Sequence, residues 1–300
     1  MCVLFVSLRP YERAENIKTV YDAYDGDKQF VQQPRWGPLD ELLATGRYKV
    51  MVTDELLNSS PGKYIFIGHG CGAFKKYGLD QPHPYFTRPD LITYAIASSE
   101  EMVPVIAKQL RISEEQVIPL GFPRMDLYFQ PMKRAERPFW LYAPTFRNWL
   151  MQIDWNEIHR PMNGDRRLIV KPHMVQPDIL PESFWQFIET ADAWEPSADY
   201  LMQMDALVTD YSSILFDAMV MRKPYALFAK DVAEYQRTRG IYYQYPRDYG
   251  PYFCDSEAEL VPMLEKVEWN DDCETAREFF VGACDGHSTE RTIELIRSCL

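Results

Sequence analysis

The chain has 300 residues, of which 46% are hydrophobic and 25% are charged, and its formal net charge is −12. A chain of this length has room for about two domains, and its apolar content excludes intrinsic disorder. The net negative charge argues against a general nucleic-acid binder, because such a protein needs a basic surface to neutralise phosphates.

The cysteines and the N-terminal residues both indicate a chain that folds in a reducing compartment. The six cysteines include no Cys-x-x-Cys pair and are too sparse for a disulfide framework, so we expect free thiols. No cluster of metal-ligating residues is visible, and we expect neither a metal ion nor another cofactor. Residues 1–10 lack the basic region of a signal peptide, and no stretch reaches the roughly 20 apolar residues of a membrane-spanning helix. We therefore expect a cytoplasmic protein.

Eight short apolar runs recur along the chain, with polar stretches between them. They are Val3–Val6, Tyr64–Ile67, Leu91–Ala97, Val117–Leu120, Phe139–Ala143, Leu168–Val170, Ala206–Thr209 and Tyr225–Phe228. Runs of this length suit strands that are buried on both faces of a parallel sheet. The stretch Ser99–Leu110 has the apolar stripe of an amphipathic helix, which Ser98 or Ser99 can cap. The alternation of strands and helices predicts an α/β fold with parallel sheets.

A polar segment bounded by prolines, Gln130–Pro138, is the best candidate for a linker. It divides the chain into two expected domains, residues 1–130 and residues 131–300. Two Rossmann-like halves that face each other would place a ligand cleft between them. In open parallel sheets, ligands bind at the carboxyl ends of the strands.

Polar side chains follow four of the predicted strands. The segments are Gly68-His69-Gly70 after the second run, Pro144-Thr145-Phe146-Arg147 after the fifth, Lys171-Pro172-His173 after the sixth, and Asp210-Tyr211-Ser212-Ser213 after the seventh. Since the carboxyl ends of parallel strands share one edge, these groups are expected to surround a ligand. Imidazoles, cations and hydroxyls are the groups that a phosphate-bearing ligand requires.

His69 lies between two glycines, which allow the backbone to approach a ligand closely and leave the imidazole free. Histidine is the side chain best suited to take a proton near neutral pH, so we interpret His69 as catalytic rather than as a turn residue. Pro172 stops its strand and is expected to direct Lys171 and His173 outward. Arg147 fits two roles equally well, a phosphate contact and a structural cation that holds a loop.

The segment that starts at Asp210 is the most informative in the chain. Asp210 ends a strand and can cap a helix from about Ser212 to Met221. Ser212 and Ser213 would then lie in the first turn, where backbone N–H groups, the helix dipole and two hydroxyls converge on a phosphate site. Asp217 shares that face of the helix. It is either a surface carboxylate or a group that accepts ligand hydroxyls or orients a histidine.

A weaker pattern points to a different cofactor. Residues 68–73 fit Gly-x-Gly-x-x-Ala, and Asp90 follows about twenty residues later, which superficially matches a dinucleotide-binding fingerprint. That fingerprint needs a long helix directly after it, whereas Gly78, Pro82 and Pro84 follow here. We therefore do not expect an NAD-dependent oxidoreductase.

Seven groups of short motifs occur between residues 69 and 291. They are His69-Gly70 with Lys75-Lys76 and Gly78; Gly121-Phe122-Pro123-Arg124-Met125-Asp126; Tyr142-Ala143-Pro144-Thr145-Phe146-Arg147; Lys171-Pro172-His173; Thr209-Asp210-Tyr211-Ser212-Ser213 with Phe216-Asp217 and Lys223-Pro224; Glu234-Tyr235 with Arg239-Gly240 and Gly250-Pro251; and Asp285-Gly286 with Ser288, Glu290 and Arg291. In kind and in order, they resemble the CDP-glycerol glycerophosphotransferase family, the teichoic-acid primases and polymerases. We identify no motif of this family in residues 1–68.

The resemblance implies a GT-B fold and a reaction in which an acceptor hydroxyl attacks the β-phosphate of CDP-glycerol and releases CMP. The first domain would hold the acceptor, and the second would bind the CDP-linked donor. By residue match, His69 would be the general base and His173 would stabilise charge on the transferring phosphate. Ser212 and Ser213 would hold the pyrophosphate, Asp217 would place the glycerol or a histidine, and Arg147, Lys171 and Asp210 would complete the donor site.

The partners implied by the resemblance are CDP-glycerol or a related CDP-alditol, and a glycan or lipid-linked acceptor; nucleic acid is not among them. A lipid-linked acceptor would bring the protein to the inner face of the membrane as a peripheral protein. Residues 69–175 carry 14 basic and 11 acidic residues, whereas residues 176–300 carry 10 and 24, so a mildly basic segment suits a small anionic donor. Two other functions stay open: a GT-B glycosyltransferase that uses a nucleotide sugar, and a non-catalytic nucleotide-binding homologue.

Overall fold

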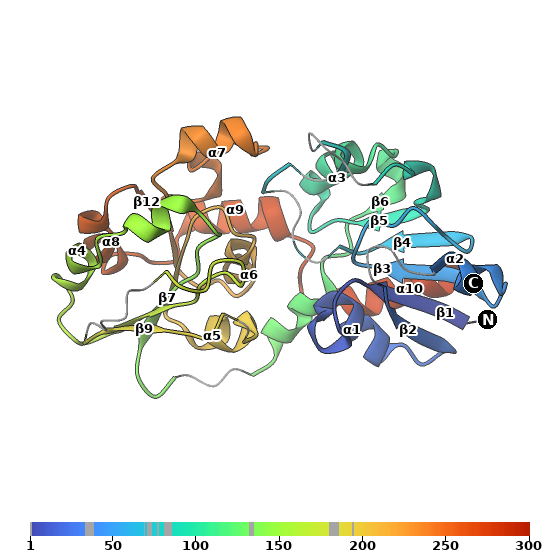
Figure 1. Ribbon diagram of the computed structural model, residues 1–300, viewed down its shortest axis with the longest axis horizontal. Helices are drawn as coiled ribbons and strands as arrows, with labels where there is room; N and C mark the ends of the chain where they lie inside the picture. Colours follow the sequence, from blue (N-terminus) through green and yellow to red (C-terminus); the bar gives the residue numbers. More distant parts are fainter. Residues whose placement is uncertain are drawn as a thin grey trace. The chain divides into compact units, whose positions relative to one another are not determined.

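The chain folds into two compact units (Figure 1). The computed structural model describes residues 2–33, 39–68, 70, 74–76, 78–80, 86–131, 135–179, 186–193 and 195–300. Unit 1 comprises Met1–Gln130 and Glu278–Leu300, and unit 2 comprises Pro131–Arg277. The sequence-based division differs at one end, because the residues after Arg277 pack with unit 1 instead of completing the second domain.

Unit 1 is built on a parallel sheet with strand order β2-β1-β3-β4-β5-β6. The strands are β1 (Cys2–Ser7), β2 (Lys28–Gln32), β3 (Tyr48–Thr53), β4 (Lys63–Phe66), β5 (Tyr94–Ile96) and β6 (Val117–Ile118). The helices are α1 (Glu15–Ala23), α2 (Leu39–Ala44), α3 (Val103–Leu110) and α10 (Ser288–Ser298). Although α10 ends the chain, it lies beside the N-terminal elements in Figure 1, and Arg297 donates to the Asp25 carboxylate at 2.7 Å.

Unit 2 is built on a second parallel sheet with strand order β12-β11-β10-β7-β8-β9. The strands are β7 (Phe139–Tyr142), β8 (Arg167–Val170), β9 (Ile188–Thr190), β10 (Ala206–Thr209), β11 (Tyr225–Phe228) and β12 (Phe253–Cys254). The helices are α4 (Trp155–His159), α5 (Ser197–Gln203), α6 (Ile214–Val220), α7 (Val232–Thr238), α8 (Glu257–Leu264) and α9 (Asp271–Val281), which continues across the unit boundary. Short 3-10 helices connect many of these elements.

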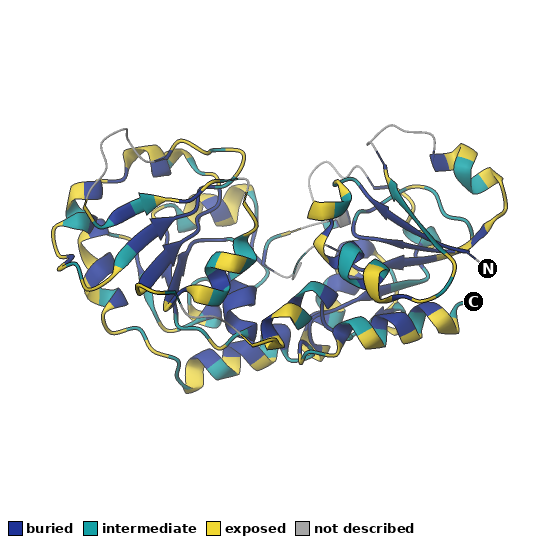
Figure 2. Cartoon of the chain, turned by 90° about the horizontal axis from the view of Figure 1, so that it is seen from below, coloured by how far each residue is buried: buried dark blue, intermediate teal, exposed yellow. Residues whose placement is uncertain are grey.

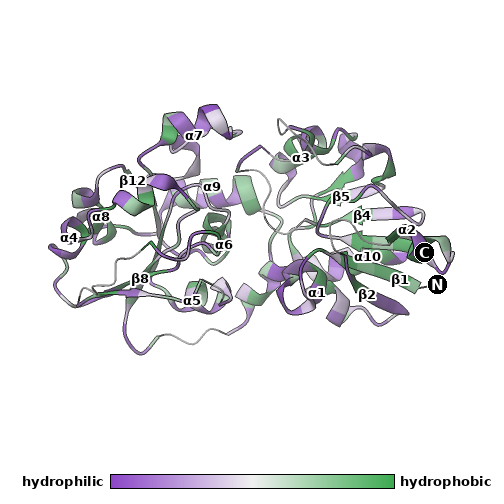
Figure 3. Cartoon of the chain, in the orientation of Figure 1, coloured by the Kyte–Doolittle hydropathy of each residue, from purple (hydrophilic) through white to green (hydrophobic). Residues whose placement is uncertain are grey.

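Strands in both sheets are mostly buried (Figure 2). Every residue of β1, β7, β10 and β11 is buried, which explains why these strands are continuous apolar runs in the sequence. Unit 2 contains one large hydrophobic core cluster, which includes Tyr142, Trp155 and Phe228. Figure 3 shows β1 and β5 as hydrophobic, whereas β2 carries hydrophilic residues.

All eight apolar runs contain strands, and the prediction of an α/β fold with parallel sheets is confirmed. Four strands were missed: β2, β3, β9 and β12. Three of these are edge strands, which need fewer apolar residues because one side has no neighbouring strand. The predicted serine cap of the helix near residue 100 is wrong, since Ser98 and Ser99 instead donate to the carbonyls of Phe280 and Phe279, at 2.6 Å each.

In each sheet the strand order reverses at one point. In unit 1 the reversal lies between β1 and β3, and in unit 2 it lies between β7 and β10. The loops that follow two strands at such a switch point leave in opposite directions, and the space beside their carboxyl ends is where ligands bind in α/β sheets. The switch point of unit 2 therefore identifies the first place to look for a functional site.

Candidate functional site

The switch point of unit 2 brings together the segments that follow β7 and β10. The two strands pair in parallel and end side by side, with Val208 opposite Tyr142. Beyond this pair, the Ala143 N–H donates to the Val208 carbonyl at 2.9 Å, and the Thr209 hydroxyl donates to the Ala143 carbonyl at 2.7 Å. The segments that begin at Pro144 and Asp210 therefore start side by side, at strand ends that are hydrogen-bonded to each other.

Asp210 is fully buried and holds the segment after β7 in place. One carboxylate oxygen accepts the backbone N–H of Thr145 at 2.8 Å, and the other accepts the Thr145 hydroxyl at 2.7 Å. The helix that follows, α6 (Ile214–Val220), has Ser213 and not Asp210 in its N-cap position, so the expectation that Asp210 caps it is wrong. A carboxylate that accepts two hydrogen bonds across neighbouring strands fixes the site's framework, because hydrogen bonds to a charged group are stronger than neutral ones.

Ser212 and Ser213 are half-buried and directly precede α6, which begins at Ile214 and ends at Val220. Their carbonyls accept the N–H groups of the first helical turn. Among the residues that the structure describes, neither the Ser212 N–H nor the Ser213 N–H has an acceptor. Two backbone donors and two hydroxyls are therefore grouped at this point, as an anion requires. Asp217 is 2% exposed, so it is not a surface carboxylate.

Arg147 is held by the carboxylate of Asp231, a residue outside the predicted site. Its guanidinium donates through Nε to Asp231 at 2.8 Å, forms an ion pair with the same residue, and lies over the Tyr235 ring at 4.9 Å. Tyr211 stacks on Tyr235 at 3.8 Å and donates its hydroxyl to Asp231 at 2.9 Å. These contacts favour the second of the two roles considered for Arg147, that of a structural cation.

The same network changes the acidity of the two tyrosines. Burial, together with the nearby Asp231 carboxylate, raises the pKa of Tyr211 well above its usual range. Burial and the charge of Asp210 raise the pKa of Tyr235 to about 12. Both phenols therefore stay protonated at neutral pH, and Tyr211 keeps its role as a hydrogen-bond donor.

His173 is half-buried beside the exposed ring of Phe146, with ring centroids 5.1 Å apart. The Val175 N–H donates to its Nδ1 at 3.2 Å, so in the neutral imidazole the proton lies on Nε2. Gln176 joins this loop to the one after β7: it accepts the Arg147 N–H at 2.9 Å and donates to the Arg147 carbonyl at 3.2 Å. His173 and Arg147 thus belong to two loops that are bonded together.

Lys171 is 5% exposed, and the expectation that it points outward is wrong. Its ammonium donates to the carbonyls of Asp192 and Ala193, at 2.9 and 3.3 Å. Burial lowers its pKa from the usual value of lysine. Lys171 therefore fixes the loop after β9, and Pro172 does not turn both of its neighbours to the surface.

His69 lies outside the residues that the structure describes, so its predicted place is not observed. The residue before it, Gly68, is described and follows β4 in unit 1. Its φ is +58°, a conformation that glycine adopts without strain. Its carbonyl accepts a hydrogen bond from Asn16 at 3.0 Å.

Two other motifs have a structural role within unit 1. Asp126 accepts the N–H groups of Ser288 and Thr289, at 3.1 and 2.7 Å, and so caps the start of α10. Arg291 donates to the carbonyls of Leu120 and Ala283 and pairs with Asp285. The Gly-Phe-Pro-Arg-Met-Asp and Asp-Gly motifs thus bind the end of the chain to the segment after β6.

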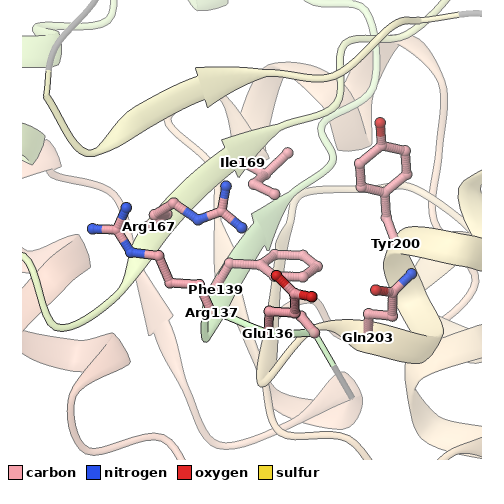
Figure 4. A pocket seen from close by; sticks show the side chains of 8 residues that line it. Glu136, Arg137, Phe139, Arg167, Ile169, Tyr200 and Gln203 are labelled. Carbon is pink, nitrogen blue, oxygen red and sulfur yellow. The ribbon is translucent and has the colours of Figure 1, made fainter. Parts of the chain in front are cut away.

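A pocket also opens at the opposite edge of the unit 2 sheet (Figure 4). Arg137, Phe139 and Arg167 line it at the amino ends of β7 and β8, together with Tyr200 and Gln203 of α5. There the Arg167 guanidinium forms an ion pair with the Glu189 carboxylate, with 2.8 Å between the nitrogen and the oxygen. This pocket is separate from the carboxyl ends of the strands and contains none of the predicted site residues.

Within the part of the chain that the structure describes, no group of three or more His, Cys, Asp or Glu side chains is arranged to hold a metal ion. Within the same residues, no helix is long and apolar enough to span a membrane.

Asp231, Gln176 and Asn16 are the functional candidates that sequence reasoning missed. Asp231 could have been found by applying the strand-end rule to the run Tyr225–Phe228, because Lys230-Asp231 follows that strand closely. Nothing in the local sequence marks Gln176 or Asn16, since both act on partners that are distant along the chain.

Two Rossmann-like parallel sheets, with polar loops at a switch point, are the architecture of the GT-B class. The structure of the wall teichoic acid polymerase TagF superimposes with a TM-score of 0.79 and 17% identity, covering 99% of this chain and 88% of that one. An MnaA–UDP co-structure from S. aureus superimposes less closely, with a TM-score of 0.62 and 12% identity, over 99% of this chain and 96% of that one. These likenesses establish the fold.

The sequence profile of the CDP-Glycerol:Poly(glycerophosphate) glycerophosphotransferase family matches residues 4–298, and the chain belongs to this family. The match extends into residues 1–68, which contain none of the short motifs. A teichoic acid poly(ribitol-phosphate) polymerase of Bacillus spizizenii is 28% identical over 265 residues, which are 77% of this chain and 42% of that protein. A teichoic acid glycerol-phosphate primase of Bacillus subtilis is 30% identical over 226 residues, 67% of this chain and 58% of that protein.

Proposed function

We propose that this protein transfers an alditol phosphate from a CDP-linked alditol to a hydroxyl group of a teichoic-acid-type acceptor and releases CMP. The observation that carries the proposal is the switch point of unit 2 in a member of this family: His173 follows β8, and Ser212 and Ser213 follow β10, on the two sides of β7. One relative is named for ribitol phosphate and another for glycerol phosphate, so CDP-glycerol and CDP-ribitol are both candidate donors.

In the proposed reaction, the acceptor oxygen forms a bond to the β-phosphorus of the donor. The bond between that phosphorus and the bridging oxygen breaks, and CMP leaves with the electron pair. His69 takes the proton of the acceptor hydroxyl as the general base. Since no covalent intermediate with the protein is required, the remaining task of the protein is to position the groups and to stabilise charge on the phosphate.

Unit 2 supplies the groups for the donor. The N–H groups and hydroxyls of Ser212 and Ser213 bind the pyrophosphate, and His173 donates its Nε2 proton to the transferring phosphate. Asp217, one turn further along α6, is 2% exposed, so of its two proposed roles the one that fits is to orient a histidine rather than to accept a hydroxyl of the alditol. Asp210 and Lys171 act indirectly, because both are buried and hold the loops of the site.

In the proposed reaction, Arg147 also acts indirectly, without binding the phosphate itself. Its guanidinium is bound to Asp231, so it holds the loop after β7 and contributes positive charge near the donor.

Unit 1 supplies His69 and binds the acceptor. We propose that the protein works at the inner face of the cell membrane as a peripheral protein, because the acceptors implied by the family are lipid-linked. Phe146, Met174 and Val175, which are exposed apolar side chains beside His173, support this location.

Chromatographic detection of the released nucleotide tests the proposed function. The protein is incubated with CDP-glycerol, CDP-ribitol or a UDP-sugar, each with and without a lipid-linked acceptor. We expect acceptor-dependent CMP release from at least one CDP-alditol and no UDP release. Release of UDP from the nucleotide sugar would establish a glycosyltransferase instead. Binding of CDP-alditols without any turnover would establish a non-catalytic homologue.

A further inference from the structure

The side chain of Gln176 binds the backbone of Arg147 in unit 2, much as a neighbouring strand would. Its Oε1 accepts the Arg147 N–H at 2.9 Å, and its Nε2 donates to the Arg147 carbonyl at 3.2 Å. Because one partner is a donor and the other an acceptor, one orientation of the amide satisfies both. Both ends of the Gln176 amide are therefore used, and they join the loop after β8 to the loop after β7.

The backbone of Gln176 closes a turn that begins at His173. The Gln176 N–H donates to the His173 carbonyl at 2.8 Å, which is the hydrogen bond of a four-residue turn. Inside this turn, the Val175 N–H donates to the imidazole Nδ1 at 3.2 Å. That bond orients the ring relative to the turn and puts the proton of the neutral ring on Nε2. The position of the turn therefore decides the position of the Nε2 proton.

The loop after β7, to which Gln176 binds, is itself held in place from two sides. Near its start, Thr145 donates to the buried carboxylate of Asp210 through its N–H and its hydroxyl. At Arg147, the guanidinium donates to Asp231 at 2.8 Å. Gln176 thus attaches the turn to a segment that is already fixed.

The turn itself has little apolar packing to hold it. Met174 and Val175, between its two ends, are 47% and 64% exposed, and the Phe146 ring beside the imidazole is 52% exposed. Side chains that stay in water bury too little apolar surface to fix a turn. The two hydrogen bonds of the Gln176 side chain therefore do much to set the distance between His173 and the loop after β7.

We propose that Gln176 is a positioning residue for the transfer reaction: it holds the turn of His173 against the loop after β7, and so places the Nε2 proton at the transferring phosphate. This inference rests on the proposed function, in which His173 stabilises charge on that phosphate. Stabilisation of this kind requires a donor that is already in place when the charge develops, and a misplacement of about 1 Å can lower a rate by about 100-fold.

The variant Gln176→Ala removes both bonds to Arg147. We expect kcat for CMP release to fall at least about 10-fold. We expect KM for the CDP-alditol to stay within about two-fold, because Ser212 and Ser213 still hold the pyrophosphate. Gln176→Met serves as a second variant if Gln176→Ala does not fold, since it keeps the length of the side chain and removes the same two bonds.

The double variant His173→Ala/Gln176→Ala shows whether Gln176 acts through the histidine. Without the imidazole there is nothing left for Gln176 to position, so we expect the double variant to be as slow as His173→Ala alone, within about two-fold. A general loss of structure would instead slow the His173→Ala protein by the same factor as it slows the unaltered protein. That result would overturn the inference.

Gln236→Ala is the matched control. Gln236 lies in α7 of the same unit, and its amide binds the Ile241 backbone in the same way: Oε1 accepts the N–H at 2.9 Å, and Nε2 donates to the carbonyl at 3.2 Å. The variant therefore loses an equivalent pair of bonds, and we expect its kcat to be unchanged. An equal loss of kcat in Gln236→Ala and Gln176→Ala would overturn the inference, because both losses would then report general destabilisation.

The same measurements separate this inference from the proposed function. If the unaltered protein releases no CMP from any CDP-alditol, the proposed function fails, and the role of Gln176 fails with it. If the unaltered protein is active and both Gln176→Ala and Gln176→Met keep full kcat, the inference about Gln176 alone is overturned.

Discussion

Asp210 binds Thr145 through both of its carboxylate oxygens, although the two residues follow different strands and are 65 positions apart. One bond goes to the Thr145 backbone N–H and the other to its hydroxyl, and both residues are buried. The pair joins the carboxyl ends of β7 and β10 at the switch point. The contact therefore ties the loop that carries Ser212 and Ser213 to the loop that carries Arg147, which Gln176 in turn joins to the loop of His173.

The first prediction concerns the stability of this pair. Thr145→Val removes the hydroxyl that donates to a buried carboxylate oxygen of Asp210, so we expect the free energy of unfolding to fall by about 1.5–3 kcal/mol, the range for a hydrogen bond to a charged group. Thr209→Val is the control, because the Thr209 hydroxyl donates to a neutral carbonyl at 2.7 Å and its loss should cost about 0.5–1.5 kcal/mol. Urea unfolding measures both. An equal cost would show that the charge of Asp210 is unimportant.

The second prediction concerns Arg147 and Asp231. Their side chains are 21% and 11% exposed, so the ion pair is shielded from water more than a surface pair. In a double-mutant cycle with Arg147→Ala and Asp231→Ala, we expect a coupling free energy of about 1–3 kcal/mol from urea unfolding. Additive effects of the two substitutions would contradict a structural pairing and would return Arg147 to the role of a direct phosphate contact.

The third prediction concerns His173. If its Nε2 proton stabilises charge on the transferring phosphate, His173→Ala should lower kcat for CMP release by about 100- to 1,000-fold. Binding of the CDP-alditol, measured by calorimetry, should change much less, since the serines hold the pyrophosphate. His287→Ala, which alters an exposed histidine of unit 1, is the control and should keep full activity. A His173→Ala variant with unchanged kcat would remove this histidine from the mechanism.

The fourth prediction is a dependence of stability on pH. Hydrogen bonds from Arg222 and Arg277 lower the pKa of Glu274 from 4.5 to about 2, despite the opposing effect of burial. A carboxylate whose pKa is lower in the folded state stabilises the fold above the unfolded pKa, and this contribution disappears as pH falls through the folded pKa. Glu274→Gln should therefore be less stable than the unaltered protein at pH 7, and the difference should vanish between about pH 4.5 and pH 2. Urea unfolding at a series of pH values measures it; a difference that is constant with pH would exclude the charge as its cause.

The fifth prediction compares two glycines with a similar backbone. Gly121 and Gly46 have φ of +75° and +67°, so alanine is strained at both positions. At Gly121 a Cβ atom would lie 2.3 Å from the Ser288 hydroxyl and 2.5 Å from the Ala283 carbonyl oxygen, whereas at Gly46 nothing lies within 4 Å. We expect Gly46→Ala to cost about 1 kcal/mol and Gly121→Ala at least about 2 kcal/mol more. Similar melting temperatures for the two variants would show that α10 can move away from the turn after β6.

The sequence by itself determined the fold class and most of the strands. A strand that is buried on both faces must be apolar along its length, so β1, β7, β10 and β11 are visible as runs without any knowledge of their neighbours. The polar residues that directly follow these runs are also visible in the local sequence. They belong to the segments that lie at the switch point of unit 2.

Only the tertiary structure decided what several of these residues do. Arg147 is bound by Asp231, Lys171 by the loop after β9, and Asp210 by Thr145, and each partner lies far away along the chain. The return of residues 278–300 to unit 1 was equally invisible. A buried position requires an apolar side chain, so burial can be predicted from the local sequence. The partner of a polar group depends on which strands become neighbours, and the packing of the whole sheet sets that order.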